Sequence, residues 1–522
     1  MARISHGNMG QEIPVWPQWH FLSAKAPQDQ RDRGWAESLG AGTLQVSKAR
    51  TDIPEDQPEC RLPKKRLCAS VEQQQRLLLR ASVYDKLLDV VPPERFDTLV
   101  AEHGGTLRTR LFPSAVTLGL FVEQVINVDD ACQDAVGRYL SQRLAMGLTP
   151  CGLSTGAYCK ARQRLPLPLL EACVREVADI ASAALPAAAC WRGREVKLID
   201  GTTVSMPDTP ALQTRFPQSG AQQPGLGFPV ARIVGVISLG SGCVSDWTVC
   251  ACRGEGTGEA QQLWRLLDTF QPGEVLLADR AYSSYFLLAA LQQRGIDFVI
   301  REHACRKNDP ARNHVLGPNE STITWDRPKQ PEWMDDADYA ALPQTLSVRE
   351  VRDGNRRLVT SLRDIQQASA EEIGWLYTQR WQIELDFRAI KCVMQMDILR
   401  CKTPDMVCKE IAAHWLGYNL IRAVMGEAAK PEGLPLRRLS FAAARRASAQ
   451  FQENLRQLAS EARRTQARFV LLQSIAHWRV PDRPGRIEPR AIKRRPKPRA
   501  LLTVPRHEAR ARIRAEQQRM WA

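Results

Sequence analysis

The sequence predicts an α/β protein, with an all-helical region before the α/β part and a basic, helical region after it. Two observations predict this order. Apolar residues recur at helical spacing from about residue 72, and after Trp191 short strand-like apolar segments alternate with helical ones. Such alternation is typical of folds in which helices cover a sheet. The length of 522 residues favours more than one domain.

Four segments follow from these patterns. The first is rich in Gln, Pro, Trp and charge and lacks periodicity, so we expect a flexible extension. In the second, apolar periodic runs end at Pro or Gly, which predicts an all-helical N-terminal domain. The third carries the strand and helix alternation, and the fourth is a basic helical region and tail. Their expected bounds are 1–70, 72–190, 191–425 and 426–522.

Within the third segment the expected order is three strands, a helix, a strand, a helix and a strand. A hairpin signal, Gly240-Ser241-Gly242, separates the second strand from the third. A segment at about 303–362 mixes Pro, Asp and β-forming residues, which predicts a β-rich insertion. The strands are expected at 194–200, 229–240, 243–251, 273–279 and 296–301, and the helices at 258–270 and 285–295.

The charge of the chain indicates a polyanionic partner. The formal net charge is +15, and from Arg479 to Ala522 there are 14 Lys or Arg against 4 Asp or Glu. An excess of this size favours nucleic acid as the partner, although a basic tail can also be a solubilising one. In the N-terminal domain, Lys160, Arg162 and Arg164 form a second basic cluster. A DNA contact and a basic surface on a packing helix are equally good interpretations of it.

Cysteine usage and hydropathy indicate the compartment. The 14 cysteines are scattered and include no Cys-x-x-Cys pair, which favours reduced thiols over a zinc site or a disulfide framework. The longest apolar run, residues 180–191, is too short to span a bilayer. The N-terminus lacks a signal sequence. We therefore expect a soluble, cytoplasmic protein with no membrane partner.

One helical face gathers chemically active groups. Tyr377, Arg380, Glu384 and Lys391 are spaced so that, at about 100° per residue, they share one side of a helix. Ser369, with Glu372 three residues later, is a capping box that starts this helix. A solvated charged stripe would explain the face. That is the usual place for charges on a helix; the alternative is a metal-binding carboxylate flanked by phosphate-binding cations, and the rest of the chain decides between the two.

Two further carboxylates favour the second interpretation. Asp200 and Asp279 each end an expected strand, and sites form beyond strand ends in open α/β sheets. Either one alone would be read as a turn former. Together with Glu384 they would repel one another unless a cation neutralised them, and two Mg²⁺ or Mn²⁺ ions suit phosphoryl transfer.

The neighbouring side chains of the helical face then acquire roles. Arg380 and Lys391 are expected to bind phosphate oxygens. Tyr377 is expected to hydrogen-bond a phosphate or stack on a base.

The residues also carry a resemblance to a known family. The spacing Tyr377-x₂-Arg380-x₃-Glu384-x₆-Lys391 resembles the Y-R-E-K signature of bacterial insertion-sequence DDE transposases of the IS-four family. The stretch Asp200-Gly201-Thr202-Thr203 is similar to the family's block around the first catalytic Asp. The stretch 277–282, LADRAY, is similar to the block around the second. The resemblance covers roughly residues 85–505.

This resemblance implies a ribonuclease-H-like catalytic core, interrupted by a β insertion before the helix that carries Glu384. It implies a DNA transposase that cleaves phosphodiester bonds at transposon ends and transfers the freed 3′-OH to target DNA. Asp200, Asp279 and Glu384 would be the catalytic metal ligands, holding two Mg²⁺ ions, with Mn²⁺ as a substitute. The implied partners are double-stranded DNA, as terminal inverted repeats and target, and a second copy in a synaptic homodimer at the bacterial nucleoid.

Three more residues are expected to bind DNA or phosphate. Thr202 and Tyr282 belong to the two Asp blocks, and Arg301 ends a strand near the expected site. For Arg301, a structural ion pair is about as good an interpretation.

Four further residues near the expected site are weaker candidates for a functional role. Glu255 and Glu259 follow the third strand and are interpreted as helix N-terminal carboxylates rather than as ligands. Trp325 and Trp333 lie in the insertion, where either could receive a flipped base. For both tryptophans a place in the core is the preferred interpretation.

Two alternatives share the same sequence features. One is a catalytically inactive or repurposed sequence-specific DNA-binding protein, which the presence of all three carboxylates disfavours. The other is a plain metal-dependent nuclease of the same fold, which the Y-R-E-K helix and the basic tail disfavour.

Overall fold

The protein was analysed as a computed structural model. It describes residues 90–104, 111–481 and 502–521, apart from gaps at 128, 130, 146, 149–150, 304–305, 307–312 and 459. Residues 71–480 and 500–522 form one compact unit. The predicted flexible extension, residues 1–70, and much of the basic tail lie outside the described residues.

The described part of the N-terminal region is helical, as predicted. Its helices pack around buried apolar residues of α4, which carries no charged residue except Glu123. One basic side chain does not face solvent: Arg162 is buried and donates to Gln124 and to the Cys401 thiol. The helices are α3 (Pro93–His103), α4 (Ser114–Ile126), α5 (Cys132–Ala145), α6 (Gly156–Arg164) and α7 (Leu167–Ala183), followed by the turn η1 (Ala187–Ala189).

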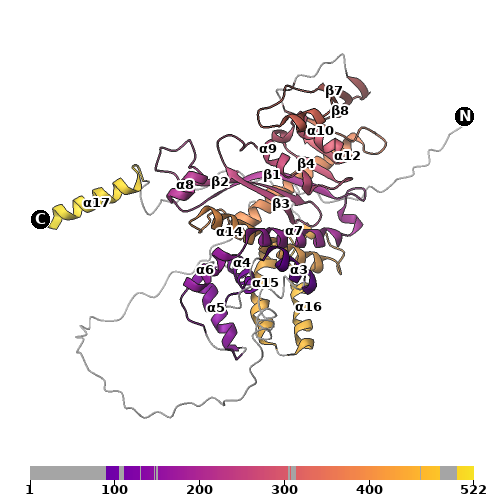
Figure 1. The fold of residues 1–522 in the computed structure, drawn as a ribbon. Coiled ribbons are helices and arrows are strands. Elements are labelled where there is room, and N and C mark those ends of the chain that lie inside the picture. The colour runs from indigo at the N-terminus through magenta and orange to yellow at the C-terminus, as the bar shows by residue number, and fades with distance from the viewer. Residues whose placement is uncertain are drawn as a thin grey trace, which may run out of the picture. The chain divides into compact units, whose positions relative to one another are not determined.

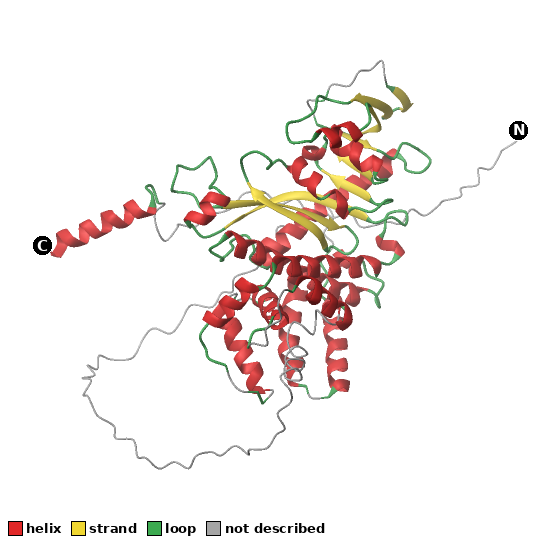
Figure 2. Ribbon diagram, in the orientation of Figure 1, coloured by secondary structure: helices red, strands yellow, loops and turns green. Residues whose placement is uncertain are grey.

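A nine-stranded mixed sheet forms the centre of the α/β part (Figure 2). Its strand order is β3-β2-β1-β4-β5-β9-β8-β7-β6, with β1, β4 and β5 parallel and the other pairs antiparallel. The strands are β1 (Val196–Ser205), β2 (Val230–Ser238), β3 (Val244–Ala251), β4 (Val275–Ala278), β5 (Asp297–Arg301), β6 (His314–Gly317), β7 (Glu320–Asp326), β8 (Thr345–Asp353) and β9 (Arg356–Thr360).

Helices cover both faces of this sheet (Figure 1). Successive strand residues alternate between two cores, as a pleated strand requires: Leu198 belongs to one core and Ile199 to the other. The first core includes α7, α12 (Ala370–Thr378), α13 (Gln382–Arg388) and α14 (Pro404–Ala429). The second includes α9 (Glu259–Arg265) and α10 (Tyr285–Gln293).

Strands β6 to β9 lie in the segment where a β-rich insertion was predicted, and they continue the central sheet beyond β5. Beyond α14 the described chain is helical. Among the described residues, no helix is long and apolar enough to cross a membrane. The remaining elements are α8 (Pro210–Arg215), η2 (Leu267–Thr269), η3 (Arg280–Tyr282), α11 (Asp336–Ala341), η5 (Gln379–Trp381), η6 (Ala389–Val393), η7 (Leu436–Arg438), α15 (Phe441–Gln457), α16 (Glu461–His477) and α17 (Arg506–Trp521).

Candidate active site

The two aspartates stand level on adjacent parallel strands. The pairing of β1 with β4 ends at Leu198 and Leu277, and the same register carried two residues further places Asp200 opposite Asp279. Asp279 directly follows β4, as predicted. Asp200 does not end its strand, which corrects the prediction. Strand β1 continues to Ser205 because its antiparallel pairing with β2 persists after β4 has ended.

The helical face is built from four short pieces rather than one regular helix. The predicted capping box is confirmed, since Ser369 accepts from the Glu372 amide and the Glu372 carboxylate accepts from the Ser369 amide. Helix α12 then passes through the 3₁₀ turn η5 into α13, and the π-helical turn η6 follows. Turns of this kind inside a helix often mark functional positions.

Arg380 joins two of the three predicted catalytic carboxylates. Its Nη1 lies 3.1 Å from Asp200 Oδ2 and its Nη2 lies 3.3 Å from Glu384 Oε1. The guanidinium therefore stands between a strand residue and a helix residue. Among the described residues, no three His, Cys, Asp or Glu side chains stand close enough to hold a metal ion as they are. Arg380 supplies the positive charge that these carboxylates need.

The electrostatics of the site fit a divalent cation. The pKa of Asp200 is raised to about 6: burial is the largest cause and the charges of Asp279 and Glu259 add to it, while the Gly201 amide and Arg380 act in the opposite direction. The raised pKa shows that burial outweighs the stabilisation that Arg380 gives to the charged carboxylate. Carboxylate oxygens are the preferred ligands of Mg²⁺. The donor set and its incomplete charge balance therefore suit a divalent cation.

The remaining predicted residues surround these carboxylates. Lys391 Nζ donates to Thr202 Oγ1 at 3.2 Å, which joins η6 to β1. Tyr377 is nearly buried, and burial raises its pKa, with Asp279 raising it and Arg380 and Arg301 lowering it. These charges place the Tyr377 hydroxyl among the site residues. Arg301 ends β5 and is exposed.

Tyr282 lies deeper than a surface DNA contact allows. Its side chain is fully buried, and its hydroxyl makes no hydrogen bond among the described residues. The charges of Glu259, Asp200 and Asp279 raise its pKa in addition to burial. The predicted direct DNA contact of Tyr282 does not fit this burial, which places the hydroxyl beneath the carboxylates.

Glu259 is a helix N-terminal carboxylate, as the sequence interpretation expected, and it also lies close to β1. It begins α9, and a Cβ atom placed on Gly201 would lie 2.8 Å from its carboxylate oxygen. The charge of Asp279 contributes to raising its pKa. Glu259 follows the N-cap Gly258 and begins α9. No local sequence signal distinguishes a carboxylate at a helix start from one that belongs to a functional site.

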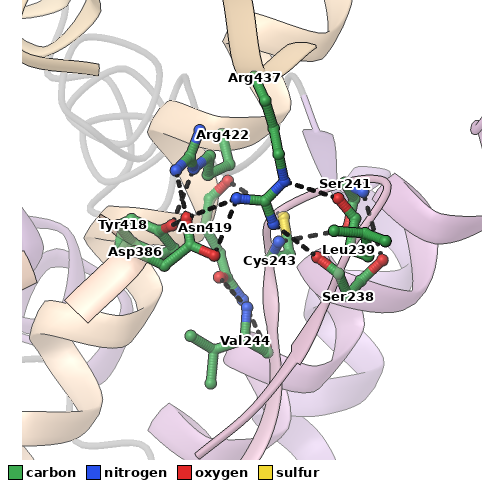
Figure 3. A network of polar contacts seen from close by, with 10 residues as sticks. All are labelled: Ser238, Leu239, Ser241, Cys243, Val244, Asp386, Tyr418, Asn419, Arg422 and Arg437. Carbon is green, nitrogen blue, oxygen red and sulfur yellow. Dashed lines mark hydrogen bonds and ion pairs between the residues drawn. The ribbon is translucent and has the colours of Figure 1, made fainter. Parts of the chain in front are cut away.

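A buried ion cluster anchors the helix that carries Glu384 (Figure 3). Asp386, two residues further on, is fully buried and binds Arg422 at 2.6 Å and Arg437 at 3.0 Å. Tyr418 donates to the same carboxylate. Arg437 also donates to the Leu239 carbonyl of the β2–β3 hairpin. Helix α13 is thereby tied to α14, to η7 and to the sheet.

The two tryptophans of the insertion take different places. Trp325 is 5% exposed, belongs to the second core, and has Arg306 3.8 Å above its ring. Trp333 is partly buried against the same core and contacts Trp264. The preferred interpretation of both as core residues therefore agrees with their packing.

Comparisons with known proteins identify the domain that carries this site. Residues 191–420 match the family described as "Transposase DDE domain". The chain is 27% identical over 347 residues to the transposase InsG for insertion sequence element IS4 of Escherichia coli, covering 65% of this chain and 75% of that protein.

Two more distant similarities accompany that match. The chain is 31% identical over 90 residues to the probable transposase for insertion sequence element IS5377 of Geobacillus stearothermophilus, covering 17% of this chain and 24% of that protein. A piggyBac transposase, solved in a synaptic complex with hairpin DNA, aligns at TM-score 0.38 and 10% identity over 78% of this chain and 87% of that one. Residues 191–420 thus match a transposase DDE domain, and the chain is similar to bacterial insertion-sequence transposases of the IS4 type, which act on DNA.

Proposed function

We propose that Asp200, Asp279 and Glu384 are the catalytic carboxylates of this transposase and that they hold two divalent cations, Mg²⁺ or in its place Mn²⁺. The observation that carries the proposal is the register of β1 with β4, which sets Asp200 level with Asp279. Glu384 reaches the same place through its shared contact with Arg380. When bound, two such cations activate water and stabilise charge during phosphoryl transfer.

The chain's own residues position the DNA. Arg380 bridges Asp200 and Glu384 in the DNA-free protein. With divalent cations held by those carboxylates, the Arg380 guanidinium would be free to bind a phosphate through a two-point contact. Lys391, held near β1 by Thr202, supplies a second positive charge to the strand. Tyr377 and Arg301 contribute a hydroxyl and a cation at the same edge.

The proposed reaction has two phosphoryl-transfer steps. Water first attacks the phosphodiester at each element end, and the bond to the leaving oxygen breaks, which frees a 3′-OH. That hydroxyl then attacks a phosphodiester of the target, joining the element to it and releasing the target's own 3′ oxygen. Asp200 and Glu384 orient the attacking oxygen, so positioning and electrostatics supply the acceleration without a covalent protein intermediate.

The finer assignments belong to the same proposal. The core of residues 191–425 is of the ribonuclease-H-like type, with the insertion at about 303–362. Residues 72–190 and the basic region after 426 bind the terminal inverted repeats, and two copies act together on the two element ends. The excess of 14 basic over 4 acidic residues after Arg479 supports a DNA-binding role for the tail.

The test is cleavage of the DNA that flanks the chain's own gene. The purified protein, with Mg²⁺, is expected to cut at the element ends and to join them to a target plasmid. Glu384→Gln is expected to bind the same DNA without cutting it. Binding without cleavage by the unmutated protein would favour the inactive DNA-binding alternative. Cleavage without joined products would favour the nuclease.

A further inference from the structure

The sheet brings a fourth carboxylate to the candidate site from its opposite face. Asp200 and Thr202 point toward the turns η5 and η6 on either side of α13, as their contacts with Arg380 and Lys391 show. Gly201, between them, faces the other way, toward α9. There the carboxylate of Glu259 fills the space that a Gly201 side chain would occupy.

Glu259 has no protein partner that accounts for its position. It makes no hydrogen bond or ion pair among the described residues, and its side chain is only partly exposed. Burial raises the pKa of Glu259, and the charge of Arg232 acts in the opposite direction. Its guanidinium, however, donates to the Thr257 carbonyl at 2.8 Å. A half-buried carboxylate beside Asp279 is therefore left without a direct counter-charge.

A second, independent observation points to the same place. The Tyr282 hydroxyl is completely buried and unpartnered among the described residues, although a buried hydroxyl normally finds a hydrogen-bond partner. Its charged neighbours are Glu259, Asp200, Asp279 and Arg232. The hydroxyl thus lies within electrostatic range of three carboxylates, which come from β1, the end of β4 and α9.

We propose that Glu259 is a fourth acidic residue of the metal site, which helps Asp200 and Asp279 hold one of the divalent cations. The inference rests on the proposed function and deepens it. Glu259 binds the cation directly or through a water that the cation holds. The Tyr282 hydroxyl donates to one of the converging carboxylates and orients it, as residues around a metal's ligands commonly do. The site then has acids on both sides of Asp200, with Glu384 on one side and Glu259 on the other.

The experiment measures Mn²⁺ binding to the full chain without DNA, by electron paramagnetic resonance of free Mn²⁺. Glu259→Gln is expected to weaken binding at least about tenfold. The matched control is Glu255→Gln, four residues earlier and exposed, which is expected to bind as the unmutated protein does. Thermal unfolding in EDTA checks that each variant folds. Glu259→Asp keeps the charge on a shorter side chain. Its affinity for Mn²⁺ is expected to lie between that of Glu259→Gln and that of the unmutated protein.

Asp279→Asn separates the two proposals. If it weakens Mn²⁺ binding and Glu259→Gln does not, the fourth-acid proposal is overturned and the metal site stands. If Asp279→Asn itself leaves Mn²⁺ binding unchanged, the metal site fails, and the role of Glu259 fails with it.

Discussion

Arg380 and Asp200 form the contact that closes the candidate site: Nη1 of the arginine lies 3.1 Å from Oδ2 of the aspartate, across two elements 180 residues apart in the chain. Because the same guanidinium reaches Glu384, one protein cation stands where two carboxylates meet. Under the proposed function, Arg380 would compete with a divalent cation in the DNA-free protein and would bind the substrate in the complex. Removing the charge of Arg380 is therefore expected to strengthen metal binding and to slow catalysis.

Replacing Arg380 separates these roles. Arg380→Gln is expected to bind Mn²⁺ more tightly than the unmutated protein, because the competing charge is gone. Its cleavage rate at the element ends is expected to fall about 100-fold or more, as when one preorganised donor is removed. Mn²⁺ titration and end-cleavage kinetics measure the two. Arg388→Gln, on the exposed side of α13, is the control. Weaker Mn²⁺ binding by Arg380→Gln would contradict the competition.

The raised pKa of Asp200 predicts a pH-dependent stability in EDTA. The folded value of about 6 exceeds the ordinary value of 3.8, so its contribution is fully present below about pH 4 and is lost as pH rises through 6. Asp200→Asn lacks this titration. Relative to that variant, the unmutated protein should lose about 2 kcal/mol of unfolding free energy between pH 4 and 7. Urea unfolding at several pH values measures this difference in unfolding free energy. If the unmutated protein and Asp200→Asn change stability in parallel between pH 4 and 7, the pKa of Asp200 is not raised.

The buried cluster at Asp386 is expected to set both stability and the placement of Glu384. Asp386→Asn leaves Arg422 and Arg437 with less counter-charge in a buried place, which costs about 3–5 kcal/mol. Asp405→Asn, which removes an exposed partner of Lys409, is the matched control and should cost less than about 1 kcal/mol. Chemical unfolding compares them. Equal costs for the two variants would show that the cluster does not anchor α13.

Lys391 is expected to contact a phosphate, which salt dependence detects. Lys391→Gln should weaken binding of element-end DNA and lower the slope of log affinity against log salt by about 0.9. Thr202→Val removes the hydroxyl that accepts from Lys391 but keeps the charge, so its slope should match that of the unmutated protein. Fluorescence anisotropy at several salt concentrations gives the slopes. An unchanged slope for Lys391→Gln would place its charge away from the DNA backbone.

The local pattern of the sequence was enough to predict most of the helices and strands of the α/β part. The alternation of apolar residues located the strands that became β2 to β5, and Ser369 with Glu372 located the start of α12. Asp279 could be placed at a strand end because β4 is short, wholly buried and followed at once by a turn. These features depend on neighbours within a few residues, which the chain records directly.

The composition of the site depended on contacts between distant segments. Asp200 was expected to end its strand, but β1 runs on because β2 continues to pair with it, and that register is a long-range property. Whether Arg380 faces Asp200 depends on how α12 and α13 rotate against the sheet. Glu259 reaches Gly201 only because α9 packs on the opposite face. The sequence alone determined which acids and bases were present, and only the tertiary structure decided which of them meet, because strand register and helix rotation are set by packing rather than by local periodicity.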